Sequence, residues 1–233
     1  MRIRDMNWSQ VEARVAGDDR CVLPIGSVEQ HAYLSLATDM ILAEKVSVEA
    51  AEPLGVPVYP CLPFGMASSF AAYPGTISIT LRSYIGVIED ILDSLHRGGF
   101  RRILIVNGHG GNTPVNPLLS EWMNRHPDSS VKLHDWWRAP ATMAKVLETD
   151  AQASHASWME NFPWTRIEGA PIPNTVKERI DFAAVGRVDA LRKRERIGEG
   201  NYHGRFQRPD DEMAAIWQVA VEETRREIAE GWH

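Results

Sequence analysis

The stretch FRRILIVNGHGGN, residues 100–112, joins the most strand-like run of the chain to a loop rich in glycine. Apolar residues fill 103–106 without polar alternation, which is typical of a strand buried on both faces. Comparable runs at 20–25, 56–61 and 130–137 alternate with longer amphipathic segments. This alternation predicts βαβ units, and therefore an α/β fold with a mainly parallel sheet.

Apolar residues at helical spacing predict the connections between these strands. In the clearest case Tyr84, Ile88, Leu92 and Leu95 recur three or four residues apart, and the helix ends at the run RGG. The same spacing predicts helices over 7–16, 39–53, 113–125 and 140–148, and a last one after Pro209. Residues 161–208 show little periodicity, and so long an irregular segment is usually functional or ordered by a partner subunit. With no repeat or linker, residues 1–233 are expected to form a single domain.

Composition narrows the class of protein. The 233 residues are 44% hydrophobic, which is enough for a substantial core, and the net charge of −6 leaves no basic patch for nucleic acid. The N-terminus lacks the apolar core of a signal peptide, and no run approaches the roughly 18 apolar residues of a membrane span. Cys21 and Cys61 lie in apolar runs that suit reduced thiols. We therefore expect a cytoplasmic protein without nucleic-acid or membrane partners.

Polar side chains follow two of the predicted strands. Glu29, Gln30 and His31 come after the strand at 20–25, and the loop NGHGGN, residues 107–112, follows the strand at 100–106. Ligands bind outside the carboxyl ends of parallel strands, so Glu29, His31 and His109 converge if these strands are neighbours. Carboxylate and imidazole groups together suit Zn²⁺, Mn²⁺ or Fe²⁺. Asp39, at the start of a predicted helix, is the natural bridging ligand.

Each of these residues also has a structural interpretation. Asp39 is equally suited to cap its helix, a lone histidine in a loop is usually solvated, and GHGG is compatible with an anion-binding nest. The glycines at 108, 110 and 111 favour the site, because they let backbone approach a ligand around His109. Asn107 and Asn112 can tie this loop through hydrogen bonds to the backbone.

A third segment, SHASWMENFPW at residues 154–164, contains His155 and Glu160. In a helix these residues would lie about 140° apart, so they serve one site from two sides or are a helix-end histidine and a solvated glutamate. Three tryptophans and two residues of the irregular segment are further candidates for the substrate site. Trp136, Trp137 and Trp158 either line a flat substrate or pack in the core or a subunit interface, and Tyr202 and His203 are candidates to close the site.

The motifs GSVEQHAYLSLATD (26–39), NGHGGN and His155-Ala156 followed by Glu160 resemble, in this order, the signatures of the creatininase (creatinine amidohydrolase) family. The segment 63–79 is similar to the family's linking segment ending in Pro-Gly-Thr. The resemblance implies a three-layer αβα sandwich, two divalent metal ions per subunit and hydrolysis of the C–N bond of a small non-peptide amide. It also implies a homo-oligomer, commonly a hexamer.

Carried over position by position, the resemblance implies a role for each motif residue. Glu29 and His109 would hold one metal ion, His31 and Glu160 the other, and Asp39 would bridge them. His155 would be the acid/base. Apart from the resemblance, Gln30, Asn107 and Asn112 are candidates to orient the ligands through hydrogen bonds. This chain differs from relatives at Gly111, where creatininase has a glutamate, and at Phe70, where many relatives have a histidine. The interval from His31 to Asp39 is also one residue shorter than in many relatives.

The reaction expected for such a site is attack by a metal-bridging hydroxide on a linear or cyclic amide, with a proton delivered to the departing nitrogen. Two alternatives remain open at this point. The same site would hydrolyse a lactone or another ester, and a protein without catalysis would use the glycine loop to bind a small molecule or an anion. An α/β-hydrolase is excluded because the chain has no G-x-S-x-G motif.

Overall fold

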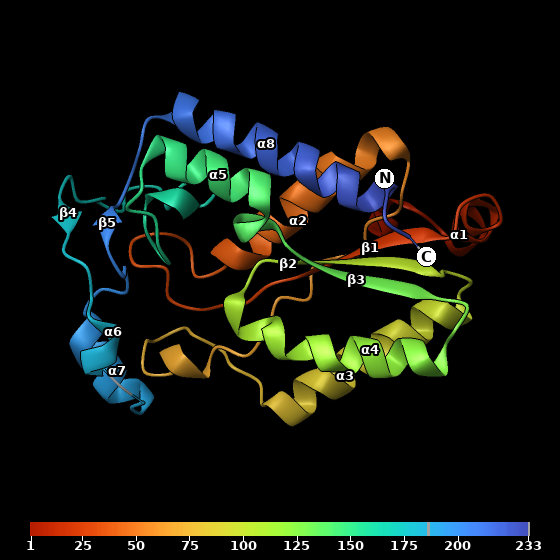
Figure 1. Ribbon diagram of the computed structural model, residues 1–233, viewed down its shortest axis with the longest axis horizontal. Helices are drawn as coiled ribbons and strands as arrows, with labels where there is room; N and C mark the ends of the chain where they lie inside the picture. The colour runs from red at the N-terminus through yellow and green to blue at the C-terminus, as the bar shows by residue number, and fades with distance from the viewer. Residues whose placement is uncertain (186, 233) are drawn as a thin grey trace.

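The computed structural model describes residues 1–185 and 187–232 (Figure 1). Its main sheet consists of parallel strands in the order β1(Arg20–Ile25), β2(Arg102–Asn107) and β3(Ser130–Asp135). Val22 pairs with Leu104, and Leu104 pairs with Lys132. The carboxyl ends of the strands point toward the side of the molecule that holds β4, β5, α6 and α7 (Figure 1).

Helices cover both faces of the sheet. Figure 1 shows α2(Thr38–Ala51), α5(Pro140–Thr149) and α8(Asp210–Ala229) on one face and α3(Leu81–Arg97) and α4(Asn116–Arg125) on the other. The short helix α1(Trp8–Val15) begins after Asn7, whose side chain accepts a hydrogen bond from the Gln10 N–H. The predicted three-layer αβα sandwich with a mainly parallel sheet is thus confirmed.

The strands divide the core into two clusters because successive side chains of a strand point to opposite faces. Val22 and Leu104 pack with Leu42 of α2 and residues of α8. Ile103 and its neighbours of odd number pack with residues of α3 and α4, among them Ile88. Both faces of β1 and β2 are therefore buried, which explains their continuous apolar sequence.

The predicted strand over 56–61 is wrong as a regular strand. This segment runs beside β1 and forms isolated bridges at Val58 and Leu62. Its backbone contributes N–H donors at Tyr59 and Leu62 to carbonyls of β1. Proline has no N–H, so Pro57 and Pro60 interrupt the ladder. An apolar extended segment thus borders β1 without completing a strand.

The irregular region 161–208 contains short elements at the edge of the fold. It holds β4(Val176–Lys177), β5(Gly204–Arg205), α6(Phe182–Val185) and α7(Ala190–Ile197), and β4 and β5 pair antiparallel. Turns of 3-10 helix lie at η1(Ile3–Asp5), η2(Glu52–Leu54), η3(Ser68–Phe70), η4(Gly110–Val115), η5(Trp136–Arg138) and η6(Trp158–Glu160). Two predicted elements end early, because η2 follows α2 and η5 follows β3.

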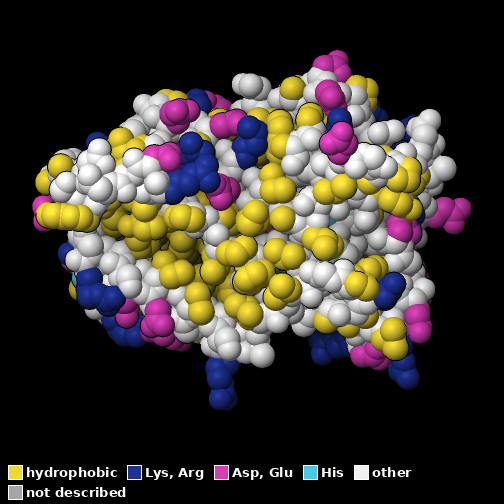
Figure 2. Space-filling view, turned by 180° about the vertical axis from the view of Figure 1, so that it is seen from behind, with side chains coloured by type: hydrophobic (Ala, Val, Ile, Leu, Met, Phe, Trp, Pro, Cys, Tyr) yellow, Lys and Arg dark blue, Asp and Glu magenta, His cyan; other side chains and the backbone are white. Residues whose placement is uncertain are grey.

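The surface carries apolar side chains as well as charges. Figure 2 shows hydrophobic side chains gathered over a broad area of the face opposite to that seen in Figure 1. Exposed apolar residues include Trp8, Phe64, Leu81 and Leu191. The homo-oligomer expected from the sequence stays a prediction. Among the described residues, no helix combines the length and the apolar character needed to cross a membrane.

The first turn of α2 lies directly against the ends of β1 and β2. A Cβ atom at Gly26 would lie 2.7 Å from the Met40 backbone, and one at Gly108 would lie 2.3 Å from the Asp39 carbonyl oxygen. Real Cβ atoms do not approach backbone so closely, so only glycine fits at these two positions. The glycines after the strands therefore allow α2 to bring Asp39 onto the end of the sheet.

We predict that Gly108→Ala destabilises the fold by about 1–3 kcal/mol, because the new methyl group overpacks the contact with α2. The free energy of unfolding in urea measures the effect. Gly86→Ala is the matched control, since Gly86 lies inside α3 with nothing within 4 Å of a new Cβ. That variant is expected to gain about 0.5–1 kcal/mol. Equal stability of the two variants would contradict the close approach.

Candidate metal centre

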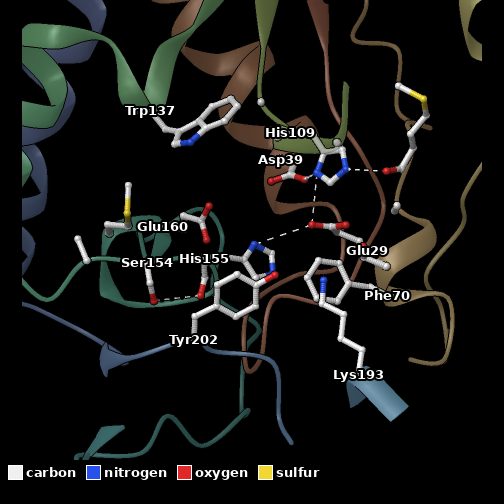
Figure 3. Close-up of a pocket in the computed structure, with 18 of the residues that line it drawn as sticks. Glu29, Asp39, Phe70, His109, Trp137, Ser154, His155, Glu160, Lys193 and Tyr202 are labelled. Carbon is white, nitrogen blue, oxygen red and sulfur yellow. Dashed lines mark hydrogen bonds and ion pairs between the residues drawn. The ribbon is translucent and has the colours of Figure 1, made fainter. Parts of the chain in front are cut away.

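Three loops and one helix bring the motif residues to the carboxyl end of the sheet. The residues converge from opposite sides of a cavity, as Figure 3 shows for those that it labels. The loop after β1 carries Glu29 and His31, the first turn of α2 carries Asp39, the loop after β2 carries His109, and residues 154–160 carry His155 and Glu160.

Asp39 lies between two histidines, and each of its oxygens faces one of them. Asp39 Oδ2 is 3.0 Å from His109 Nδ1, which is also 3.3 Å from Glu29 Oε1. Asp39 Oδ1 is 3.0 Å from His31 Nε2, which lies 3.8 Å from Glu160 Oε2. Two possible ligand groups share Asp39, namely Glu29-Asp39-His109 and His31-Asp39-Glu160, and a third group is Glu29-His31-His155. The ligand atoms within each group lie within 4.8 Å of one another.

Two buried atoms of this cluster lack hydrogen bonds, and such atoms indicate whether a metal ion would fit. Glu29 Oε2 and His31 Nε2 have no hydrogen-bond partner, although His31 Nε2 is close to an Asp39 oxygen. The other ring nitrogen, His31 Nδ1, lies 3.2 Å from the Glu29 carbonyl oxygen and donates to it, so that in the neutral ring Nε2 keeps a lone pair for a metal ion. Unpaired buried polar atoms cost free energy, and divalent ions would use these lone pairs. The donor set therefore fits metal ions.

The charges of the cluster also favour cations. Burial alone would lower the pKa of His31, but the neighbouring Asp39 and Glu160 carboxylates outweigh it and raise the pKa to about 10. Burial raises the pKa of Glu160 to about 7. Burial would raise the pKa of Asp39 too, but the His31 charge dominates and lowers it. Without metal the histidines thus hold protons that compensate the carboxylates, and divalent ions would compete with these protons.

The loop after β2 holds His109 in one orientation. The Asn107 side chain accepts a hydrogen bond from the His109 N–H and donates one to the His109 carbonyl, at 3.0 and 2.9 Å. Asn112 donates to the Gly26 carbonyl, which ties this loop to the end of β1. His109 Nε2 donates to the Met66 carbonyl at 3.2 Å, so Nδ1 faces Glu29 and Asp39. These contacts orient one imidazole as the sequence predicted for Asn107 and Asn112.

The same arrangement leaves no room for a side chain at Gly111. A Cβ atom at Gly111 would lie 2.3 Å from the Met66 carbonyl oxygen and 2.4 Å from His109 Nε2. The contact that orients His109 thus occupies the place where a side chain would begin. Gly110 is less restricted, because its Cβ would meet only Trp137, at 4.0 Å.

His155 lies beside the cluster and is held by Gln30. The Gln30 Nε2 amide donates to His155 Nε2 at 2.8 Å, and the Gln30 oxygen accepts from the Ala32 N–H. His155 Nδ1 therefore faces the cluster, 3.9 Å from Glu29 Oε1, and the Phe70 ring stacks on the imidazole with centroids 4.8 Å apart. Burial lowers the pKa of His155 well below its usual value, and the His31 charge adds to this effect. The imidazole is accordingly neutral.

Two alanines in this region adopt the left-handed conformation, which disfavours residues with a Cβ. Ala32, after His31, has φ 49°, and Ala156, after His155, has φ 58°; they are the only residues other than glycine with positive φ in the described part of the chain. Ala156 donates its N–H to Glu160 Oε2 at 2.6 Å. Each strained alanine thus directs a backbone N–H to a side chain of the site, as is common where strain serves function.

The segment with His155 and Glu160 is not a helix, so the predicted angle of 140° does not apply. Residues 155–157 form a turn, and η6 begins only at Trp158. The Ala156 N–H captures the Glu160 carboxylate, which folds the segment back on itself. Both side chains therefore face the cavity, and the interpretation of Glu160 as a solvated glutamate is wrong.

The cluster lies at the base of a cavity of about 420 Å³. The lining of this cavity includes five motif residues, and it also contains Trp137, Phe70, Gly110, Gly111 and Tyr202. The five are Glu29, Asp39, His109, His155 and Glu160. The proposal that Trp136 and Trp158 line a substrate is wrong, because both are buried in the core under α8. His203 does not line the cavity either; its backbone N–H is bonded to Ser154 and Asn201.

The cavity also contains residues that the sequence patterns did not single out. Met143 and Met159 add apolar surface, and Lys193 of α7 is the only Lys or Arg among the described residues that line it. Its position in the helix could have indicated that its side chain faces the protein. Lys193 lies four residues before the buried Ile197 and so on the same face of the helix.

Both the sequence and the fold of the chain resemble those of known proteins. The sequence profile of the creatininase family, described as creatinine amidohydrolase, matches residues 4–162. Creatinine amidohydrolase from Pseudomonas putida is 35% identical over 118 residues, which is 48% of this chain and 45% of that protein. The mycofactocin precursor peptide peptidase of Mycolicibacterium smegmatis is 35% identical over 101 residues, 39% of each chain. The matched segments thus span less than half of these relatives.

Solved structures agree over nearly the whole chain. A crystal structure of creatinine amidohydrolase (creatininase) superimposes with a TM-score of 0.77 at 23% identity, covering 98% of this chain and 96% of that one. A mutant creatininase of Zn-Zn type and a creatininase described as the Mn form match with TM-scores of 0.75 and 0.76. At this identity the likeness shows that the fold is shared.

We predict that Asp39→Asn loses at least about half of the bound metal, because Asp39 is the carboxylate that both ligand groups share. Metal per chain is measured by plasma mass spectrometry after expression with added Zn²⁺ or Mn²⁺. Glu44→Gln is the control, since Glu44 lies on the same helix and contacts Arg4 at 3.6 Å. A full metal content in Asp39→Asn would show that Asp39 is not a ligand.

Proposed function

The chain belongs to the creatininase family, and on this premise we propose that it is a metal-dependent amidohydrolase. Its reaction is the hydrolysis of the C–N bond of a small non-peptide amide, linear or cyclic. The observation that carries the proposal is Asp39, which offers one oxygen to each of two buried groups of carboxylate and imidazole ligands. A carboxylate shared in this way is typical of a centre with two metal ions.

In this proposal Glu29 and His109 would hold one ion, His31 and Glu160 would hold the other, and Asp39 would contribute to both. Divalent ions such as Zn²⁺ or Mn²⁺, when bound, would supply Lewis acidity that acidifies a water and polarises the carbonyl under attack. The donor set of carboxylate oxygen and imidazole nitrogen accommodates several such ions.

His155 is the residue that we assign to proton transfer. In amide hydrolysis the attacking water forms a C–O bond and loses a proton, the C–N bond breaks, and the departing nitrogen gains a proton. His155 is enclosed, lines the cavity and turns Nδ1 toward Glu29. The Gln30 amide contacts Nε2, so Nδ1 is the ring nitrogen that faces the cavity.

We predict that metal-loaded protein hydrolyses at least one small amide, and that removal of metal by a chelator lowers the rate at least about tenfold. The measurement is a screen of formamides, cyclic ureas and lactams, with matched lactones, before and after Zn²⁺ or Mn²⁺ is returned. Hydrolysis of lactones alone would replace the amidohydrolase with an ester hydrolase. Inertness of fully loaded protein toward all of them would favour a binding protein.

A second prediction concerns His155→Ala. This variant is expected to keep its fold and metal content but to lose about 10²–10⁴-fold in kcat, which is the usual contribution of general acid-base catalysis. Circular dichroism, metal analysis and steady-state kinetics report these quantities. His96→Ala serves as the control, because His96 pairs with Asp128 at the surface. Normal turnover by His155→Ala would show that the proton transfer belongs to another group.

A further inference from the structure

One cationic side chain in the cavity has no role in the proposed reaction. Lys193 belongs to the basic run LRKRER in α7, and its amine reaches the cavity next to Phe70 (Figure 3). The other basic residues of the run are engaged elsewhere. Arg192 faces Asp189 at 3.6 Å, Arg194 donates to the Ala72 carbonyl, and Arg196 donates to the Val185 carbonyl.

The Lys193 amine lacks an anionic partner among the residues that the structure describes. Its closest recorded contact is the Phe70 ring, whose centroid lies 4.8 Å from Nζ. Burial lowers the pKa of Lys193, and the Glu29 carboxylate opposes this effect from within electrostatic reach. Glu29, however, is assigned to a metal ion. A half-buried ammonium group therefore points into a cavity with only a ligand carboxylate to balance it.

The charge of the loaded cavity strengthens this imbalance. Two divalent ions would offset Glu29, Asp39, Glu160 and the attacking hydroxide, and Lys193 would then leave the cavity with a net positive charge. Enclosed clefts of one sign concentrate ligands of the opposite sign. The cavity thus selects for negative charge on whatever occupies it.

We infer that Lys193 binds a carboxylate on the substrate, so that the amides cleaved at this centre are acidic, with N-acyl amino acids as the simplest class. The inference rests on the proposed amidohydrolase function. Lys193 Nζ and the centroid of the His155 ring each lie 4.8 Å from the Phe70 centroid, so they are separated by at most twice that distance. A carboxylate next to the scissile amide spans such a distance. Trp137, Met143 and Met159 offer apolar surface for the rest of the molecule.

Lys193 has a second possible role, which the test must separate from the first. Its cation lies over Phe70, and Phe70 stacks on His155, so the amine could act only by positioning these rings. A positioning residue would affect acidic and neutral substrates equally. A residue that binds the substrate carboxylate would affect the acidic one alone.

The test compares N-formyl-alanine with N-formyl-alaninamide, by release of formate, in the Zn²⁺-loaded wild type and Lys193→Met. We expect Lys193→Met to lower kcat/KM for N-formyl-alanine about tenfold or more, as for the loss of a charge-assisted hydrogen bond. We expect kcat/KM for N-formyl-alaninamide to stay within about twofold of the wild-type value. Lys193→Arg should retain most of the preference. Arg192→Met, which removes an exposed charge one residue away, should leave kcat/KM for both substrates unchanged.

Calorimetry provides a readout that needs no turnover. Succinate and its half-amide, succinamate, each offer one carboxylate to the ions, but only succinate offers a second. Lys193→Met should weaken the binding of succinate about fivefold or more and the binding of succinamate less than about twofold, at unchanged metal content. Equal losses for the paired compounds would overturn the inference. If the wild type hydrolyses neither formyl compound while calorimetry shows the Lys193 difference, the amidohydrolase proposal fails for them and carboxylate binding stands.

Discussion

The first turn of α2 packs against bare backbone at the ends of β1 and β2, and the position of the whole centre depends on this contact. Gly26 and Gly108 leave no side chain between helix and strands. Asp39 can therefore lie within 3.0 Å of histidines from two different loops. Ser27 donates a hydrogen bond to Asp39 Oδ2 at 3.0 Å, so the strand end also orients the carboxylate that it receives.

The close packing of three carboxylates creates a charge problem that the fold alone does not solve. Glu29, Asp39 and Glu160 are buried together, and only His31 and His109 supply compensating protons. Of the six buried side-chain atoms that lack a hydrogen-bond partner in the described part of the chain, two belong to this cluster, and the left-handed alanines follow His31 and His155. Strain and unpaired polar atoms in one place are expected where a structure is built for a ligand rather than for its own stability. Bound cations would neutralise the excess negative charge and would give the unpaired polar atoms a partner.

Chemistry and recognition come from different parts of the fold. The sheet end and α2 supply the ligands, which are fixed by backbone contacts in the rigid core. The surrounding surface comes from η3, from the turn at 155–157 and from α7, which belong to connecting segments. Such segments change more easily than a core, so one centre can serve different substrates within a family. In this chain such segments contribute Phe70, Tyr202 and Lys193 to the lining of the cavity.

Much of this arrangement was predictable, because strands buried on both faces and amphipathic helices have distinct apolar periods. The layers, the parallel sheet and the convergence of Glu29, His31 and His109 follow from such local patterns and from the rule that parallel strands present their carboxyl ends at one edge. The strand predicted over 56–61 failed where Pro57 and Pro60 lack the donors that a ladder needs.

What only the tertiary structure decided is the distance between segments that are far apart in sequence. Local patterns did not show that Trp136 and Trp158 are core residues, that the Ala156 N–H turns Glu160 inward, or that α7 brings Lys193 to the cavity. The sequence by itself determined which chemical groups follow each strand, since this depends on neighbours along the chain. Packing determined which of them meet, because that depends on how close two backbones can approach.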